Sequence, residues 1–279
     1  MQFDFTVEQV AELLPRINAE VWHNALARVL PKWDINTPNR VAGFIAQTSH
    51  ESAGYSVLTE NLNYSAEALD KIFPKYFKRA GIDAGDYHRQ PEKIANIIYA
   101  NRMDNGDTNS GDGWRFRGGG VLQLTGRYNY TQFGNAEEIT AKEATDFVRT
   151  PIGALASACW FWNANNINSY CDNQDIVGMT KRINGGTIGL EDRKKHYEHA
   201  LEVLGGHYSP SRVSPLGFET VRIGSRGHTV IRLQEELGLD ADGIFGKGTE
   251  AKLKGWQSLR GLTADGIAGP QTLGILFND

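Results

Sequence analysis

Apolar residues recur at helical spacing through most of the first two hundred positions. In the segment 37–51, Thr37 precedes Pro38, which pairs a helix-capping residue with a proline at the first helical position. The apolar side of this segment follows the i, i+3, i+4, i+7 spacing of one buried helix face, formed by Val41, Phe44, Ile45 and Thr48. The pattern predicts an amphipathic helix that ends near residue 51.

Other segments have the same character. The segments 91–102 and 151–164 each begin with proline and continue with apolar residues at helical spacing, and 6–14 opens with Thr6 as a helix cap. Strand signals are thin: GVLQLTG (120–126) alternates only moderately and fits either a short strand or an extended loop. We therefore predict that residues 1–204 form a mainly α domain with long irregular connections.

The pattern changes after residue 204. Residues 205–217 hold glycines, serines and prolines with little periodicity, and we interpret them as a linker. Beyond them, LDADGIFGKGT (239–249) aligns with LTADGIAGPQT (262–272) at an offset of 23, with seven of eleven positions identical. Each unit is typical of a short helix, an Asp-Gly turn and a threonine that caps the next helix. Since neither unit could bury its apolar face alone, we predict a small helical repeat domain over 218–279.

Composition narrows the classes of function. The net charge of −4 and the pI near 6.0 argue against general electrostatic binding of nucleic acid or anionic membrane. The longest mostly apolar run, 153–162, is shorter than the roughly 20 residues that span a bilayer, so we expect no stable membrane insertion. The N-terminus carries Asp4 and Glu8 and has no basic leader before an apolar stretch. We therefore expect no signal peptide and synthesis into a cytoplasm.

Neither cysteines nor histidines form a metal-ligand pattern. Cys159 and Cys171 are expected to be reduced, buried thiols, because a cytoplasmic chain of this size needs no disulfide. A zinc protease requires His-Glu-x-x-His, and here Gly54 occupies the place of the second histidine. His196 and His199 are only weak evidence for a metal site, so we expect neither metal nor cofactor.

The stretch HESAGYSVLTEN (50–61) holds two glutamates with different surroundings. Glu51 lies seven positions and about 20° from Phe44 around the helix, at the end of the apolar stripe. Desolvation and the negative helix end favour the protonated carboxyl that a general acid needs. Gly54 provides an exit from the helix that lets the chain turn back, and Glu60 lies in a polar stretch suited to an ionised general base. Carboxyls roughly 6.5–9.5 Å apart would suit an inverting glycosidase.

Three motifs carry a family resemblance: SHESAGY (49–55), GVLQLTGRYNY (120–130) and KRINGG (181–186). In this order they resemble glycoside hydrolase family 19, which includes plant-type chitinases and many bacteriophage endolysins. The resemblance covers about residues 5–205 and implies a lysozyme-like, α-rich catalytic domain over 1–204. It also implies that Glu51 is the general acid, that Glu60 is the general base and that Thr125 holds the attacking water.

The same motifs imply positions that bind the sugar. These are Gln123, Asn129 and Asn184, with Arg193 as a looser match in GLEDRKKHY. Amide side chains suit N-acetyl and hydroxyl groups because they both donate and accept hydrogen bonds. The alternative for each amide is a structural role in holding a loop, and for Arg193 it is a structural ion pair.

The C-terminal repeat resembles a peptidoglycan-binding module with a DGxxGxxT element in each half. Together the two resemblances imply a monomeric bacteriophage endolysin that cuts the β-1,4 bond between N-acetylmuramic acid and N-acetylglucosamine of bacterial peptidoglycan, with inversion. Such an enzyme would reach the wall from the host cytoplasm after membrane permeabilisation, for example through a phage holin. The alternatives are a chitinase with the same glutamates, a non-catalytic wall-binding protein and, most remotely, a metal-dependent amidase or peptidase.

Overall fold

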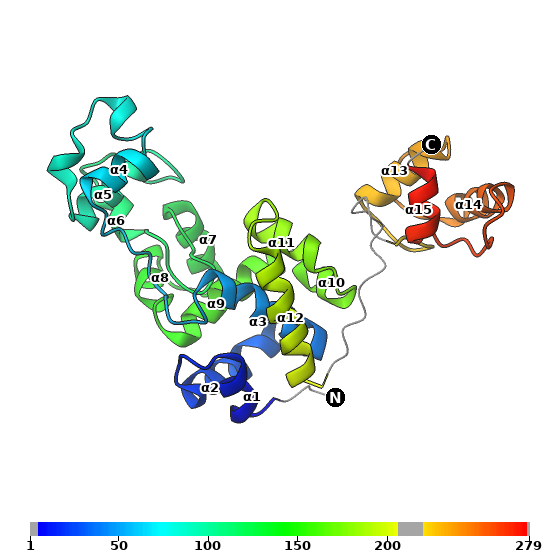
Figure 1. Cartoon of the computed structure of the whole chain (residues 1–279), viewed down its shortest axis with the longest axis horizontal. Coiled ribbons are helices and arrows are strands. Elements are labelled where there is room, and N and C mark those ends of the chain that lie inside the picture. Colours follow the sequence, from blue (N-terminus) through cyan, green and yellow to red (C-terminus); the bar gives the residue numbers. More distant parts are fainter. Residues whose placement is uncertain (1–4, 206–219, 278–279) are drawn as a thin grey trace. The chain divides into compact units, whose positions relative to one another are not determined.

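The computed structural model describes residues 5–205 and 220–277, and it is mostly helical in both parts (Figure 1). Within these residues, extended pairing is limited to isolated β-bridges. This confirms the prediction of a mainly α protein. None of the described helices is both long enough and apolar enough to cross a membrane.

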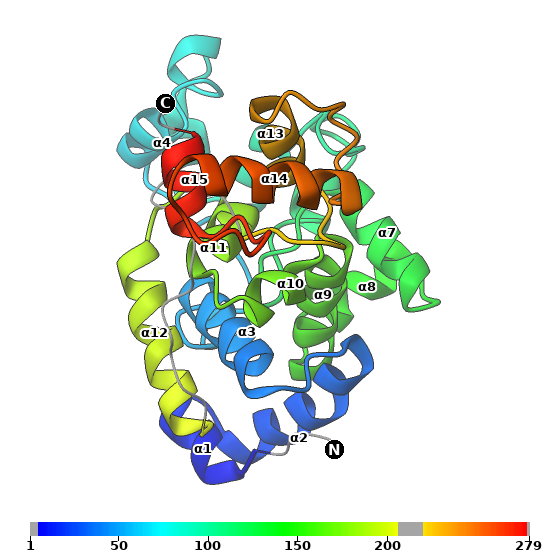
Figure 2. The same ribbon diagram turned by 90° about the vertical axis from the view of Figure 1, so that its right-hand side faces the viewer.

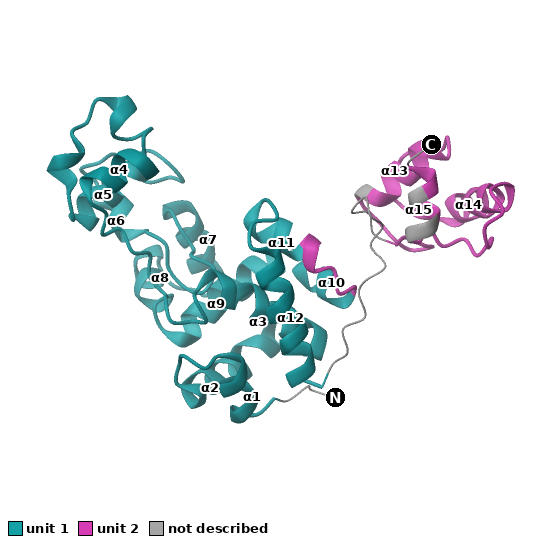
Figure 3. Cartoon of the chain, viewed as in Figure 1, with its two compact units in different colours: residues 1–172, 179–208 teal, residues 173–178, 209–279 magenta. Residues whose placement is uncertain are grey.

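The chain divides into two compact units (Figure 3). The first contains 1–172 and 179–208, and the second contains 173–178 and 209–279. The sequence pattern gives no indication that 173–178 groups with the second unit. The expected linker, 205–217, lies outside the described residues except for its first position.

The first unit is built from α-helices with three short 3₁₀ turns at Leu30–Trp33, Lys78–Ala80 and Ala84–Tyr87. Its α-helices are α1 (Val7–Leu13), α2 (Ala19–Val29), α3 (Pro38–Glu51), α4 (Ala66–Ile72), α5 (Pro91–Ile98), α6 (Asp112–Arg115), α7 (Arg127–Ala136), α8 (Ala141–Phe147), α9 (Pro151–Ala164), α10 (Ile167–Asp172), α11 (Ile176–Asn184, which begins in the segment grouped with the second unit) and α12 (Leu190–Val203). The predicted helices near 6–14, 37–51, 91–102 and 151–164 correspond to α1, α3, α5 and α9.

Helix α3 is the central element of this unit and packs most extensively along α12 (Figure 2). The Thr37 side chain accepts a hydrogen bond from the Arg40 N–H at 3.3 Å, and Pro38 is the first helical residue, as predicted. The predicted apolar face is buried at all four positions, Val41, Phe44, Ile45 and Thr48. Burial of this face fixes the rotation of α3 and therefore the direction in which its C-terminal residue points.

Helix α3 ends at Glu51 because the chain then enters a left-handed turn. Ala53, Gly54 and Tyr55 all have positive φ, between 51° and 66°. The Gly54 N–H donates to the Ser49 carbonyl oxygen at 2.8 Å, and the buried Tyr55 hydroxyl bonds to Thr48 at 2.7 Å. The exit predicted at Gly54 is therefore present, although the two neighbouring non-glycine residues share the unusual conformation.

A second hydrophobic cluster lies in the part of this unit between α3 and α6. It is formed by Leu62, Leu69, Phe77, Ala84, Ile94, Ala95 and Ile98, with Tyr99 and Trp114 packed against it. This cluster anchors the chain that follows Glu60 and the end of α5.

The segment 120–126, which fitted a strand or a loop, is an irregular loop with bridges at its edges. Gly119 pairs with both Thr59 and Leu124, and the Gly120 N–H donates to the Leu58 carbonyl oxygen at 3.0 Å. The backbone after Leu58 therefore lies directly beside the glycine-rich segment that precedes Gln123.

The second unit contains α13 (His228–Glu236), α14 (Lys247–Leu259) and α15 (Pro270–Leu276). Its core includes residues from both repeats: Val221, Val230, Leu233, Leu237, Phe245, Leu253, Ala268, Leu273 and Leu276. Residues 242–249 and 265–272 each wrap around a buried glutamine. Gln234 bonds to Asp242, Gly243, Ile244 and Thr249, and Gln257 bonds to Asp265, Gly266, Ile267 and Thr272.

These glutamine networks correct one prediction for the repeat. Thr249 and Thr272 do not cap helices, because Gly246 and Gly269 occupy the capping positions of α14 and α15. Each threonine hydroxyl instead lies within hydrogen-bond distance of the glutamine of its own repeat, at 3.2 and 3.3 Å. The threonines stabilise the turn rather than start the next helix.

The two cysteines are free and buried, as expected. Burial raises the pKa of both Cys159 and Cys171, so each thiol stays protonated near neutral pH. Cys171 Sγ lies 3.4 Å from the sulfur of Met179. Both cysteines act as small core residues.

Candidate active site

Glu51 is the last residue of α3, and its carboxylate pairs with a residue of α12. Arg193 Nη2 lies 2.5 Å from Glu51 Oε1, and Arg193 Nη1 donates to Gln47 Oε1 at 2.7 Å. The guanidinium is almost completely buried, whereas the Glu51 side chain is 29% exposed. Arg193 thus holds two residues one helical turn apart on α3.

This pairing changes the predicted surroundings of Glu51. The sequence pattern placed this carboxyl at the end of an apolar stripe, and the structure places a guanidinium in direct contact with it. The sequence allows an ion pair as one alternative for Arg193, but it does not identify Glu51 as the partner because the two residues are 142 positions apart. Gln47 lies four residues before Glu51, a spacing that marks it as a neighbour on the same helix face.

Glu60 is held by two hydrogen bonds, one to each carboxylate oxygen. The Tyr99 hydroxyl donates to Oε1 at 2.7 Å, and the Gly118 N–H donates to Oε2 at 3.1 Å. Burial raises the pKa of Tyr99, and the charge of Glu60 raises it further, so the phenol remains a donor. The half-buried carboxylate is thereby fixed in orientation.

Gly118 separates Glu60 from Gln123 and has no room for a side chain. A Cβ atom at Gly118 would lie 2.7 Å from Gln123 Oε1 and 3.1 Å from Glu60 Cβ. The two side chains therefore flank the same glycine. Tyr99 and Gly118 are site residues that sequence reasoning missed, because no local spacing links them to Glu60.

Three of the predicted site residues line one pocket: Gln123, Thr125 and Asn129. They are joined through short local bonds: Thr125 Oγ1 donates to the Gln123 carbonyl oxygen at 2.8 Å, and Asn129 Nδ2 donates to that of Thr125 at 2.8 Å. Gln123 itself has a φ of 53°, and its amide donates to the Gly120 carbonyl oxygen at 3.0 Å. Trp160 borders the same pocket and is only half-buried.

Asn184 is placed differently. It is exposed at the end of α11, and its side-chain amide donates to the Ile188 carbonyl oxygen at 3.2 Å. Among the described contacts, no hydrogen bond joins it to the other predicted site residues. The structure thus brings Glu51 to Arg193 and brings Glu60 to the loop of Gln123, with Asn184 apart from both groups.

Residues 24–184 match the family model described as chitinase class I of glycoside hydrolase family 19, and residues 229–276 match a putative peptidoglycan binding domain. The chain is 41% identical over 158 residues to a glycosyl hydrolase family 19 domain-containing protein of Haemophilus influenzae, covering 56% of this chain and 76% of the relative. It is 32% identical over 100 residues to an endochitinase of Arabidopsis thaliana, covering 33% of this chain and 35% of that protein.

The fold resembles that of chitinase C from Streptomyces griseus, with a TM-score of 0.52 and 18% identity over 75% of this chain and 97% of the other. The family model covers more than half of the chain, and the Haemophilus influenzae relative is matched over most of its length. The chain belongs to glycoside hydrolase family 19, with a peptidoglycan-binding domain at its C-terminus.

Proposed function

We propose that this protein is an endolysin of bacteriophage type that hydrolyses the β-1,4 bond between N-acetylmuramic acid and N-acetylglucosamine, with inversion at the anomeric carbon. Glu51 donates a proton to the leaving oxygen, and Glu60 takes a proton from a water molecule held by Thr125. In an inverting reaction this water attacks from the face opposite the leaving group.

The observation that carries the proposal is the domain pairing. A family 19 catalytic domain and a peptidoglycan-binding domain share one chain, over 24–184 and 229–276. A module that holds the enzyme on an insoluble wall raises the local substrate concentration without adding contacts to the reacting bond. Chitin has no peptide stems and offers less reason for such a module.

The surroundings of Glu60 support its role as base. Two donors, Tyr99 and Gly118, orient the carboxylate without supplying a full positive charge. The hydroxyl of Thr125 donates to a backbone carbonyl, so its oxygen lone pairs are oriented to accept from a water molecule. Gln123 and Asn129, in the same pocket, offer amide groups for N-acetyl and hydroxyl groups of the sugar.

When Glu51 acts as an acid it gives up a proton, and the Arg193 guanidinium beside Oε1 lies next to the carboxylate that remains. The second bond of Arg193, to Gln47, keeps the buried guanidinium partnered when Glu51 becomes neutral.

The endolysin role includes the route to the wall. We propose synthesis in the host cytoplasm and release through a membrane lesion such as a phage holin makes. Cutting of the glycan strands then causes lysis. The peptidoglycan partner follows from the C-terminal domain, and the holin acts without direct contact.

A chitinase is the second candidate, because the relatives include an endochitinase and a chitinase. Release of reducing ends separates the two, measured on purified peptidoglycan and on N-acetylglucosamine hexamer. The proposal predicts faster release from peptidoglycan, and chitinase activity predicts the reverse. Glu51→Gln should abolish lysis of peptidoglycan while leaving pull-down on it intact. A wall-binding protein without catalysis would show no release with either substrate.

A further inference from the structure

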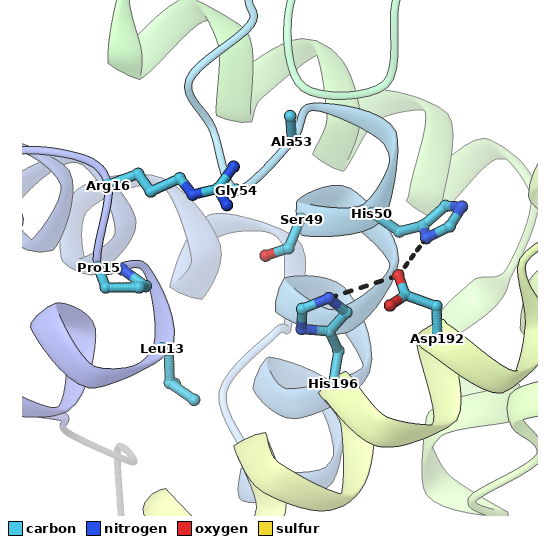
Figure 4. A pocket seen from close by; sticks show the side chains of 9 residues that line it. All are labelled: Leu13, Pro15, Arg16, Ser49, His50, Ala53, Gly54, Asp192 and His196. Carbon is cyan, nitrogen blue, oxygen red and sulfur yellow. Dashed lines mark hydrogen bonds and ion pairs between the residues drawn. The ribbon is translucent and has the colours of Figure 1, made fainter.

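A second pocket lies beside the C-terminal end of α3, next to the predicted general acid (Figure 4). We call it the α3-end pocket and define it by Arg16, Ser49, His50, Gly54, Asp192 and His196. Ser49, His50 and Gly54 belong to the segment 49–54 that contains Glu51. Ala53 of the same segment also lines the pocket. The pocket therefore borders the turn that joins the two predicted catalytic carboxyls.

The ionisable residues that line the α3-end pocket are one arginine, two histidines and one aspartate. His50 Nδ1 lies 2.6 Å from Asp192 Oδ2, and His196 Nε2 lies 3.5 Å from the same oxygen. The hydrogen bond from His50 holds the pKa of Asp192 below its usual range. Asp192 is therefore ionised, and its carboxylate lies next to both imidazole rings. Arg16 is exposed, has no ion-pair partner among the described residues and reaches across the pocket toward Gly54 (Figure 4).

Ser49 provides an independent sign of a ligand. Its side chain is 4% exposed, and its hydroxyl oxygen has no hydrogen-bond partner among the described residues. A buried hydroxyl without a partner costs stability, so such a group is expected to have a role. In Figure 4 this oxygen points into the pocket between Arg16 and His196.

The rest of the lining is apolar and includes Leu13, Pro15 and Ala53. A fitting ligand therefore combines a carboxylate with small apolar groups such as methyls. Peptidoglycan has this chemistry on every second sugar: the lactyl group of N-acetylmuramic acid and the peptide attached to it carry methyl groups and carboxylates. Chitin has no such arm. The pocket includes residues on both sides of Glu51 in the sequence, and a peptide arm extends by about 3.3–3.6 Å per residue, so an arm of a few residues is long enough to bridge from a sugar at Glu51 to the pocket.

We propose that the α3-end pocket binds the carboxylate-bearing lactyl-peptide arm of peptidoglycan, with Arg16 and His196 on the carboxylate and Ser49 as a further donor. This inference rests on the proposed function and assigns the recognition of muramic acid over N-acetylglucosamine to residues outside the family motif around Gln123. The pocket then determines the substrate class, and the glutamate pair performs the reaction.

The test compares Arg16→Ala with wild type on purified peptidoglycan and on N-acetylglucosamine hexamer. We expect kcat/KM on peptidoglycan to fall about tenfold, mainly through KM, with no change on the uncharged hexamer. Arg28→Ala, which removes an exposed arginine elsewhere in the same unit, is the matched control and should change neither. An equal loss on both substrates, or no loss on either, would overturn the inference.

A third substrate identifies the carboxylate. An amidase that strips the peptides from peptidoglycan hydrolyses the lactyl amide, which leaves a free lactyl carboxylate on the glycan. If the loss in Arg16→Ala persists on it, the pocket also accepts the freed lactyl carboxylate; if the loss disappears, the pocket binds only the peptide carboxylates. Both results support the pocket.

Binding supplies a readout that does not depend on turnover. N-acetylmuramyl dipeptide is titrated by calorimetry into full-length Glu51→Gln, alone and combined with Arg16→Ala or Ser49→Ala. We expect Arg16→Ala to weaken binding about tenfold, and Ser49→Ala to weaken it without lowering the melting temperature, because it removes an unpaired buried hydroxyl. Absence of dipeptide binding would overturn the inference. If wild type does not cut peptidoglycan but binds the dipeptide through Arg16, the proposed function fails and the pocket assignment stands.

Discussion

Arg193 Nη2 lies 2.5 Å from Glu51 Oε1, and the same guanidinium donates to Gln47 one turn earlier on α3. The pair joins the ends of α3 and α12 at the residue expected to protonate the leaving group. Since Arg193 is buried and cannot lose its charge, its removal changes both the position and the charge environment of Glu51.

We predict that Arg193→Gln lowers kcat on peptidoglycan by at least about tenfold, because the general acid loses its positioning partner. Arg193→Lys should recover only part of the activity, since one ammonium cannot hold Glu51 and Gln47 as a planar fork does. Initial rates and melting temperatures are measured together, with the exposed Arg182→Gln as control. A folded Arg193→Gln protein as active as Arg182→Gln would refute the positioning role.

Gly118 is expected to tolerate no side chain. We predict that Gly118→Ala lowers activity about tenfold or more, because the methyl group displaces Gln123 or Glu60 from the site. Gly248→Ala is the control, since a Cβ there meets nothing within 4 Å. Kinetics on N-acetylglucosamine hexamer report the effect, and full activity of Gly118→Ala would show that the close approach of Glu60 and Gln123 to Gly118 is not needed.

Asp112 should make the catalytic unit sensitive to acid. Burial raises its pKa, but bonds from Arg127 and the Gly106 N–H outweigh this and hold the pKa below the usual 3.8. The stabilisation is therefore present above pH 3.8 and is lost as the pH falls through the lower folded value.

We predict that Asp112→Asn lowers the free energy of unfolding by about 1–3 kcal/mol at pH 7 and that the difference from wild type shrinks as the pH falls below 3.8. The exposed Asp104→Asn serves as control. Urea unfolding at pH 7 and at a pH below 3.8 measures the difference in unfolding free energy between Asp112→Asn and wild type. A difference that does not change with pH would contradict the lowered pKa of Asp112.

The repeat domain makes a paired prediction. Gln257→Ala leaves the amide and carbonyl groups of the 265–272 turn unpaired and should destabilise the domain by about 1–3 kcal/mol, with Gln234→Ala equivalent. Hydrogen exchange of the turn amides should rise and pull-down on peptidoglycan should weaken, while cleavage of soluble oligomers stays unchanged. Ser258→Ala, on the exposed side of α14, is the control. Unaltered exchange in Gln257→Ala would show that the glutamine does not stabilise the turn.

The parts of this protein that were predictable from sequence are those with local causes. The Thr37 cap, the buried face of α3 and the turn at Gly54 each depend on residues within a few positions of one another. The repeat could also be recognised in the sequence. Its two turns have the same backbone hydrogen-bonding groups to satisfy, so they use similar residues. Its threonines were misassigned, since the glutamine that binds each one lies fifteen positions earlier.

The site was predictable only as a set of positions. Family resemblance pointed to Glu51, Glu60, the loop of Gln123 and, more loosely, Arg193, but it did not indicate that Arg193 pairs with Glu51 or which residues hold Glu60. Tyr99 is 39 residues from Glu60, so only the folded chain brings the two together. The same is true of the α3-end pocket: Arg16 and His196 line it together but lie near opposite ends of the first unit's sequence.

The most direct test of the central claim is mass spectrometry of purified peptidoglycan after digestion by the full-length protein and reduction with borohydride. We predict fragments that end in reduced N-acetylmuramic acid, present with wild type and absent with Glu51→Gln. Fragments that end in reduced N-acetylglucosamine, or free stem peptides, would contradict the account.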